Sequence, residues 1–160
     1  MQPLTYDKKR TALLVIDPYN HFISEGGKVW DRIKAVAQAN GCVPHMLQVL
    51  DAARLAEFRV FYALHRGYRP GDHETWEFIA PVQQAAWKRQ TFEYGTWGGE
   101  IRREFAPQPG DIAALEHWCS SGFASTDLIC MHAALSINIP NYASAVVTAD
   151  ELLGALAPSG

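Results

Sequence analysis

Four stretches of the chain are largely apolar and predict strands, and the first is typical of a strand that is buried on both faces of a parallel sheet. The runs cover residues 11–17, 59–64, 111–115 and 142–147. The first run ends in Asp17. A carboxylate is therefore expected at the C-terminal end of the first strand, where open α/β sheets bind their ligands.

Between these runs, apolar residues recur at helical spacing. One such stretch covers about residues 29–40 and ends at Gly41, a residue type that commonly follows the last turn of a helix. A second begins near Pro44, because proline suits the first position of a helix. Thr148 and Glu151 form a T-x-x-E capping box and predict the start of a last helix.

Strands that alternate with helices predict βαβ units and a three-layer, doubly wound, mostly parallel α/β sheet. The chain supplies about four strands, which predicts a truncated form of this architecture. All of residues 1–160 are expected to form one domain, since this length is typical of one domain and no repeat divides the sequence. Residues 66–109 show little periodicity, and so long a loop usually carries function.

Composition excludes several classes of protein. With 48% hydrophobic and 11% aromatic residues, the chain is neither disordered nor fibrous. The 14 Lys and Arg residues against 17 Asp and Glu residues give a net charge of -3 without long runs of like charge, so no nucleic-acid partner is expected. No apolar run approaches the roughly 18 residues of a membrane span, so no membrane partner is expected.

Cysteine usage indicates a reducing compartment. Cys42, Cys119 and Cys130 are odd in number and show no C-x-x-C spacing, which argues against a disulfide framework or a structural zinc site. The first ten residues contain no apolar segment of the secretory type. A cytoplasmic location is therefore expected.

Two strand ends carry candidate catalytic residues. Asp17 and Asn20 follow the first strand, and Glu116 and His117 follow the third. A histidine beside Asp17 could share its proton or orient a nucleophile. The alternatives are an aspartate that only caps the following turn and a histidine that is only a buried, hydrogen-bonded core residue.

Large side chains near the same strand ends are expected to line a pocket for a flat or apolar small molecule, or alternatively to complete the core. The pocket is predicted to contain Asn20, Phe22, Trp97, Trp118 and Phe123. A metal site built from His65, Asp72 and His73 has no recognised ligand spacing, so neither a metal nor another cofactor is expected. The expected partners are a small-molecule ligand and further copies of the chain in a homo-oligomer.

Several stretches together resemble the isochorismatase-like cysteine hydrolases. They are ALLVIDPYN at residues 12–20, SEGGK at 24–28, KRQTF at 88–92, WGG at 97–99 and EHWCSSGFASTDL at 116–128. The resemblance implies a doubly wound hydrolase with an Asp, Lys and Cys triad at the C-terminal edge of the sheet. Its thiolate would attack an amide or related C–N bond, with Asp as general base, whereas other members act on enol ethers without a nucleophilic step.

Asp17 matches the family aspartate, but the chain departs from the pattern at the other two positions. Leu115 or His117 stands at the lysine position, depending on the register. The central segment that bears the nucleophilic cysteine is missing between about residues 128 and 131. Cys130 at this junction lacks the small-residue turn that would activate a thiol. Cys119 lies two residues after His117 in the sequence and is the alternative candidate to replace the missing nucleophile.

Three interpretations follow. In the first, the chain is a cysteine hydrolase by descent, for a small amide, C–N or enol-ether substrate, that is impaired because the nucleophilic cysteine is absent. In the second, it is a non-catalytic small-molecule-binding or assembly subunit. In the third, it is the unstable product of a damaged gene.

Overall fold

The computed structural model describes residues 6–118 and 148–156. Its sheet has three parallel strands in the order β1-β2-β3. They are β1 (Ala12–Ile16), β2 (Arg59–Ala63) and β3 (Ile112–Ala113). Past the ends of β2 and β3, an isolated parallel bridge joins His65 to His117. The expected α/β fold with a parallel sheet is confirmed, with three strands among the described residues.

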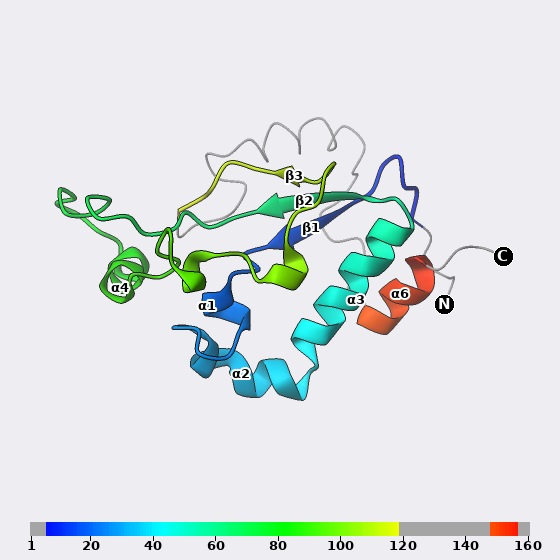
Figure 1. Cartoon of the computed structure of the whole chain (residues 1–160), viewed down its shortest axis with the longest axis horizontal. Helices are drawn as coiled ribbons and strands as arrows, with labels where there is room; N and C mark the ends of the chain where they lie inside the picture. The colour runs from blue at the N-terminus through cyan, green and yellow to red at the C-terminus, as the bar shows by residue number, and fades with distance from the viewer. Residues whose placement is uncertain (1–5, 119–147, 157–160) are drawn as a thin grey trace.

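The longer helices lie on one side of this sheet or beyond its end. Helix α3 (Cys42–Leu55) contacts β2, and α6 (Ala149–Leu156) packs beside α3. Helix α2 (Trp30–Ala39) meets the N-terminal end of α3. Helix α4 (Pro81–Arg89) lies beyond the C-terminal ends of the strands, in a segment that projects from the sheet (Figure 1).

Three short helical turns surround the C-terminal end of β1. The first is α1 (Asn20–Ile23), and the other two are the 3-10 turns η1 (Trp97–Gly99) and η2 (Arg103–Phe105). An isolated antiparallel bridge between Tyr19 and Ile101 joins the chain before α1 to the stretch between the two 3-10 turns. This bridge holds residues 97–105 against the end of β1.

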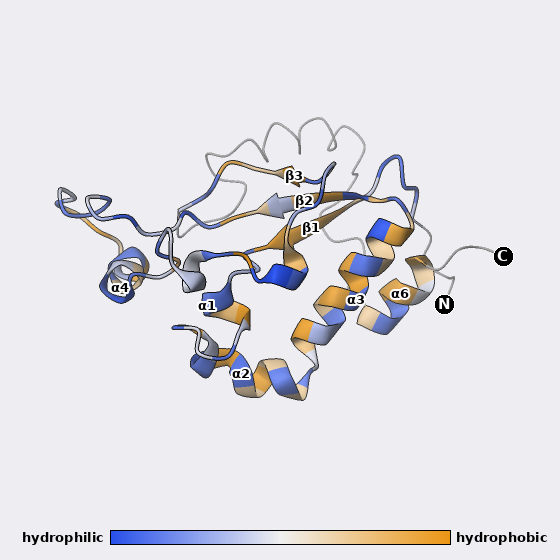
Figure 2. Cartoon of the chain, viewed as in Figure 1, coloured by the Kyte–Doolittle hydropathy of each residue, from blue (hydrophilic) through white to orange (hydrophobic). Residues whose placement is uncertain are grey.

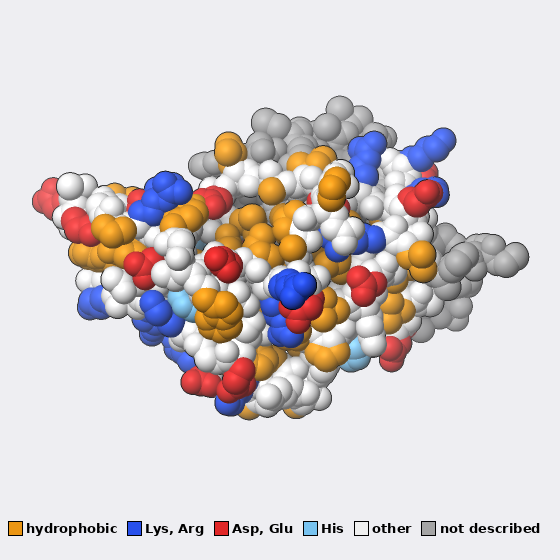
Figure 3. All heavy atoms as spheres, viewed as in Figure 1, with side chains coloured by type: hydrophobic (Ala, Val, Ile, Leu, Met, Phe, Trp, Pro, Cys, Tyr) orange, Lys and Arg blue, Asp and Glu red, His pale blue; other side chains and the backbone are white. Residues whose placement is uncertain are grey.

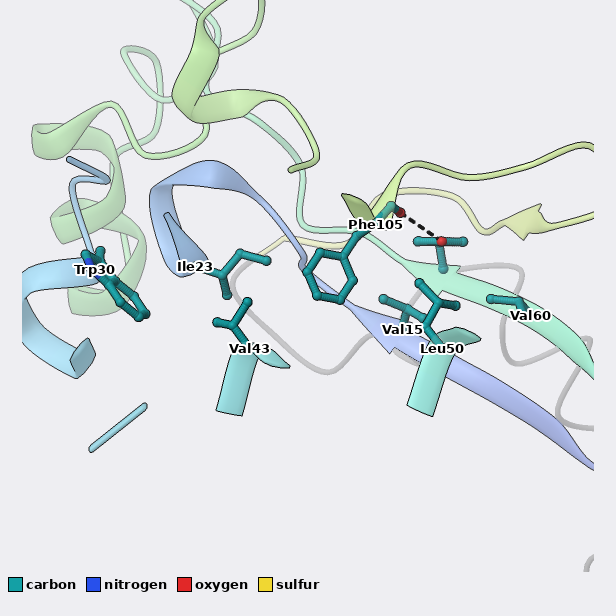
Figure 4. Close-up of a cluster of buried hydrophobic side chains, with 8 residues drawn as sticks. Val15, Ile23, Trp30, Val43, Leu50, Val60 and Phe105 are labelled. Atoms are coloured by element: carbon teal, nitrogen blue, oxygen red, sulfur yellow. Dashed lines mark hydrogen bonds between the residues drawn. The ribbon is translucent and has the colours of Figure 1, made fainter. Parts of the chain in front are cut away.

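The main core lies between the sheet and α3, and its side chains come from β1, β2, the first three helices and η2 (Figure 4). Its buried members are Val15, Ile23, Trp30, Val43, Leu50, Val60, Tyr62 and Phe105. The hydroxyl of Tyr62 donates to the carbonyl oxygen of Phe105 at 2.9 Å. Strand β1 is hydrophobic along its length (Figure 2), as its apolar run predicted. The core therefore fixes β1 and β2, whose ends carry the candidate site.

One helix boundary required a correction. Helix α3 begins at Cys42 rather than at Pro44, which is the third residue of the helix. Proline is tolerated there because the N–H groups of the first helical turn have no partner within the helix. Gly41 separates α2 from α3 and has a φ of 57°, a conformation that glycine adopts without steric cost.

The expectation of a long loop over residues 66–109 was wrong in part. This region contains α4, which begins with Pro81 at its first position, and the two 3-10 turns. The strand expected over residues 111–115 is only two residues long. The capping box is confirmed, because the Thr148 N–H donates to Glu151 Oε2 at 2.7 Å and the Glu151 N–H donates to Thr148 Oγ1 at 3.2 Å.

The strand expected over residues 142–147 lies outside the described residues, and so does the junction at residues 128–131. Among the described helices, none combines the length and the apolar content that crossing a membrane would require.

Candidate functional site

Asp17 is the first residue after β1 and is held in an unusual backbone conformation. Its φ is 49°, a left-handed value in which aspartate is among the better tolerated non-glycine residues. Its Oδ1 accepts the backbone N–H of His65 at 2.6 Å. The carboxylate therefore binds the chain just after β2 and does not cap only its own turn.

His117 lies next to this carboxylate. Its Nδ1 is 2.7 Å from the carbonyl oxygen of Trp118, so Nδ1 carries a proton and donates it. Its Nε2 lies 3.7 Å from Asp17 Oδ1 and is buried without a hydrogen-bond partner among the described residues. Of the two residues that the sequence offered at this position, Leu115 is exposed and His117 faces Asp17.

Burial is the largest influence on the pKa values of Asp17 and His65. The pKa of Asp17 is raised by burial, and the His65 N–H, His117 and His65 counteract this only in part. Burial also lowers the pKa of His65, whose ring centroid lies 5.6 Å from that of His117. A carboxyl with a raised pKa beside an imidazole nitrogen can hold and release a proton closer to neutral pH than an exposed aspartate can.

Aromatic side chains form the wall behind the pair. The Tyr19 hydroxyl donates to the His65 carbonyl oxygen at 2.9 Å, and the Tyr19 ring stacks on Phe92 with centroids 4.7 Å apart. Burial raises the pKa of Tyr19, so the phenol stays protonated as a donor. Phe92 also contacts the rings of Phe22 and His65, at centroid distances of 4.8 and 5.2 Å.

Glu116 forms a second polar group on the same sheet edge. Its carboxylate accepts a hydrogen bond from the Tyr94 hydroxyl, and the guanidinium carbon of Arg69 lies 3.8 Å from the centre of the Tyr94 ring. Burial raises the pKa of Glu116, while Arg66 and Arg69 lower it to a smaller extent. Glu116 therefore adds a second carboxyl group with a raised pKa to this edge of the sheet.

The residues expected to line one pocket are divided in the structure. Asn20 and Trp97 border a cavity of about 840 Å³ bounded by α1, α2, α3 and residues 97–104. Asn20 Nδ2 also donates to the Trp97 carbonyl oxygen at 2.8 Å, so its amide holds η1 against α1. Phe22 instead packs on Phe92, and Phe123 lies outside the described residues.

Trp118 belongs to a different cluster, in the segment that projects beyond the strands. The Arg66 guanidinium lies over its ring at 4.9 Å, and His73 and Trp76 contact it at centroid distances of 5.4 and 5.1 Å. Within the described part of the chain, no three or more His, Cys, Asp and Glu side chains gather as a metal site.

His65 and Phe92 contribute to the site, but the sequence analysis did not predict that they lie there. His65 follows the second apolar run, and the rule that selected the residues after the first and third runs applies equally to it. Phe92 ends the KRQTF stretch of the family resemblance, which assigns it no role, and its φ of 56° is rare for a bulky residue. Its backbone N–H donates to His21 Nδ1 at 2.9 Å, a contact between distant parts of the sequence.

Cys42, the one cysteine among the described residues, is exposed at the start of α3 and contacts Met46. Cys119 and Cys130 lie outside the described residues. The described site is therefore built from carboxyl, imidazole, phenol and guanidinium groups.

Residues 11–139 match the isochorismatase domain. The chain belongs to the isochorismatase family. The resemblance deduced from residues 11–128 is thereby confirmed. The chain is 30% identical, over 138 residues, to ureidoacrylate amidohydrolase RutB of Rhizobium rhizogenes, covering 79% of this chain and 55% of that protein. It is 29% identical to the corresponding protein of Agrobacterium fabrum, of which it covers 60%. The chain thus spans little more than half the length of these relatives.

Solved structures agree with this family fold. A cysteine hydrolase from Pseudomonas syringae superposes with a TM-score of 0.63 at 23% identity, over 82% of this chain and 57% of that one. The N-carbamoylsarcosine amidase from Thermoplasma acidophilum superposes with a TM-score of 0.55 at 26% identity, over 78% and 61% of the two chains. The first likeness concerns the fold alone.

Proposed function

We propose that this isochorismatase-family chain binds a small molecule at the Asp17–His117 pair and carries out no cysteine-dependent hydrolysis. The observation that carries the proposal is the 3.7 Å contact between His117 Nε2 and Asp17 Oδ1. An imidazole exchanges a proton near neutral pH, whereas the lysine of the family pattern keeps its proton there. The Asp17–His117 pair therefore differs in chemistry from the Asp and Lys that accompany the nucleophilic thiolate in the family triad.

The cysteines of the chain support the loss of thiol chemistry. Cys42 is exposed at the start of α3, away from the strand ends. Cys130 stands between Ile129 and Met131, without the small residues that would expose a thiol at a helix N-terminus and lower its pKa. Cys119 remains the cysteine closest in sequence to His117, and a free cysteine is usually a small buried hydrophobic residue.

The ligand class follows from the relatives. One is named for ureidoacrylate and another for N-carbamoylsarcosine, and both names describe hydrolysis of an amide-type bond. We therefore propose that the chain recognises a small amide or related C–N compound, without turnover through a thioester.

A turnover and binding assay tests this proposal. The purified chain is incubated with small amides and ureido acids, with and without iodoacetamide, and release of ammonia is measured. We expect no iodoacetamide-sensitive release. Sensitive turnover that disappears in Cys119→Ser or in Cys130→Ser would overturn the proposal and identify the nucleophile.

Binding is measured as a rise in melting temperature with ligand, because a ligand that binds only the folded state stabilises it by mass action. The rise should be lost in Asp17→Asn and kept in Asp51→Asn, which changes an exposed aspartate on α3 in the same way. A chain without a cooperative melting transition would instead support the unstable product of a damaged gene.

A second candidate, acid-catalysed hydrolysis of an enol ether, is favoured by the raised pKa of Asp17. This reaction begins with proton transfer to the substrate and needs no thiol, so a buried carboxylic acid can supply it. Turnover of a small vinyl ether should resist iodoacetamide, decline as pH rises and be abolished in Asp17→Asn. Turnover that is equal in Asp17→Asn and in the unaltered chain would eliminate this candidate.

A further inference from the structure

Two apolar surfaces are exposed on the described part of the chain. The first is the tip, residues 74–84, of the segment that projects beyond the strand ends (Figure 1). It exposes Trp76, Phe78 and Val82, and the side chain of Phe78 is 87% exposed. Hydrophobic and acidic side chains lie together at this end of the molecule (Figure 3). Protruding aromatic residues of this kind are frequent anchors of protein interfaces.

The second surface is a groove beside β1, which is an edge strand of the described sheet. This β1 groove has a volume of about 830 Å³ and is lined by β1, α2, α3 and Ala149 of α6. Ile16, Ile33 and Val36 line it and are well exposed, Val36 by 67%. An edge strand whose apolar flank none of the described residues covers is a site at which another chain readily associates.

The tip and the β1 groove are complementary in shape and in charge. The tip projects, and the groove is concave. The tip carries Glu74 and Glu77 and no lysine or arginine. Among the residues that line the groove, Arg32 and His45 are the ionisable side chains with a basic group, and no carboxylate is present. An acidic knob and a basic-rimmed groove attract each other and disfavour pairing of two tips.

We propose that the tip of one copy of the chain docks into the β1 groove of a second copy. Phe78 then lies against the apolar side chains of the groove, and Glu77 approaches Arg32. The second copy is the occupant that covers both exposed surfaces at once, whereas a segment of the same chain in the groove would leave Phe78 in water. Because tip and groove are different surfaces, the contact is head-to-tail and builds a ring or a linear polymer.

Light scattering coupled to size exclusion, over a range of protein concentrations, measures the assembly. We expect the unaltered chain to have a mass above that of the monomer, increasing with concentration. Phe78→Asp or Val36→Asp should raise the dissociation constant by about 30-fold or more, the effect typical of an interface hot spot. Leu55→Asp is the matched control, because Leu55 is equally exposed and lies on neither surface.

A mixing experiment separates this arrangement from a symmetric one. The Phe78→Asp variant keeps an intact groove, and the Val36→Asp variant keeps an intact tip. An equimolar mixture of the two monomeric variants should therefore form a dimer and no larger species. A mixture that stays monomeric would overturn the proposal, as would an unaltered chain that is monomeric at every concentration.

Charge reversal provides variants that do not alter the apolar surfaces. Arg32 is exposed, so Arg32→Glu should fold normally and weaken the assembly, and Glu77→Lys in the same chain should restore it. If residues 119–147 of the same chain fill the groove instead, the unaltered chain and all the variants are monomeric. In that case Val36→Asp only lowers the melting temperature. That result would also overturn the proposal.

Discussion

Nε2 of His117 faces Oδ1 of Asp17 at 3.7 Å, and the carboxylate oxygen that it faces is the one that accepts the His65 N–H. The strand ends of β1 and β2 and the extension of β3 thus meet at one carboxylate. Because this carboxylate is mostly buried, its ionisation depends on its surroundings. Its titration therefore reports on whether the site is assembled as described.

Asp17→Asn should change how stability depends on pH. The folded-state pKa of Asp17 is raised above 3.8, so the folded chain binds this proton more tightly than the unfolded chain does. Stability that comes from the protonated carboxyl is present at low pH and is lost as pH rises from about 4 through the folded pKa. Urea unfolding should show that Asp17→Asn gains stability relative to the unaltered chain over this range.

The corresponding Asp51→Asn variant changes an exposed carboxylate and should show no such gain. If Asp17→Asn instead becomes less stable than the unaltered chain as pH rises, the ionised form of Asp17 is the one that stabilises the fold. In that case the groups that lower the pKa of Asp17, first of all the His65 N–H, outweigh burial.

His21 should make the chain less stable in mild acid. Its pKa is lowered from 6.5 chiefly by burial, with a smaller contribution from Lys28, and its Nδ1 accepts the Phe92 N–H. A protonated imidazole cannot accept that hydrogen bond. Stability should therefore be complete above pH 6.5 and decrease as pH falls through the folded pKa of His21. An NMR titration of the His21 ring tests this, with the urea-unfolded chain as reference, and a midpoint above 6.5 would contradict it.

Gly99→Ala should destabilise the chain by about 2 kcal/mol, the cost typical of overpacking. A Cβ at this position would lie 2.1 Å from the carbonyl oxygen of Glu93, a backbone atom that cannot rotate away. Gly154→Ala is the matched control, because a Cβ there meets no atom within 4 Å and Gly154 lies within α6. Alanine is the better helix former, so this variant should be stabilised by up to about 1 kcal/mol. Thermal unfolding measures both changes, and equal effects at the two glycines would refute the packing around η1.

Asp111→Ala should cost about 3 kcal/mol, because it leaves the guanidinium of Arg54 mostly buried and without its charge partner. The ion pair spans 2.6 Å, and its side chains are only 16% and 10% exposed. Arg54 also donates to the hydroxyl of Tyr62, so the pair supports the end of α3 against β2. Glu57→Gln, which breaks the exposed pair with Lys8, should leave chemical denaturation unchanged. If Asp111→Ala and Glu57→Gln lower the free energy of unfolding by similar amounts, the pair of Arg54 and Asp111 is exposed to solvent.

The apolar runs and the capping box determined much of the secondary structure by themselves. A continuous run such as residues 12–16 can be buried on both faces only in a covered sheet, so β1 and β2 were predictable from local pattern. The closeness of Asp17 and His117 was also predictable, because each follows a strand and parallel strands bring their C-terminal ends to one edge of the sheet. The family was also determined by sequence, since its motifs lie in continuous stretches.

Tertiary contacts decided the rest. Whether Leu115 or His117 faces Asp17 depends on the pairing of His117 with His65, which no periodicity specifies. Asn20 borders a cavity, and its amide also holds the carbonyl of Trp97, a residue far along the chain that no local pattern links to it. Helix α4 has no buried residues, so the sequence contained no apolar face that would predict it. Local patterns record which side chains leave water, whereas the hydrogen bonds and ring contacts of the site join segments that meet only when the chain folds.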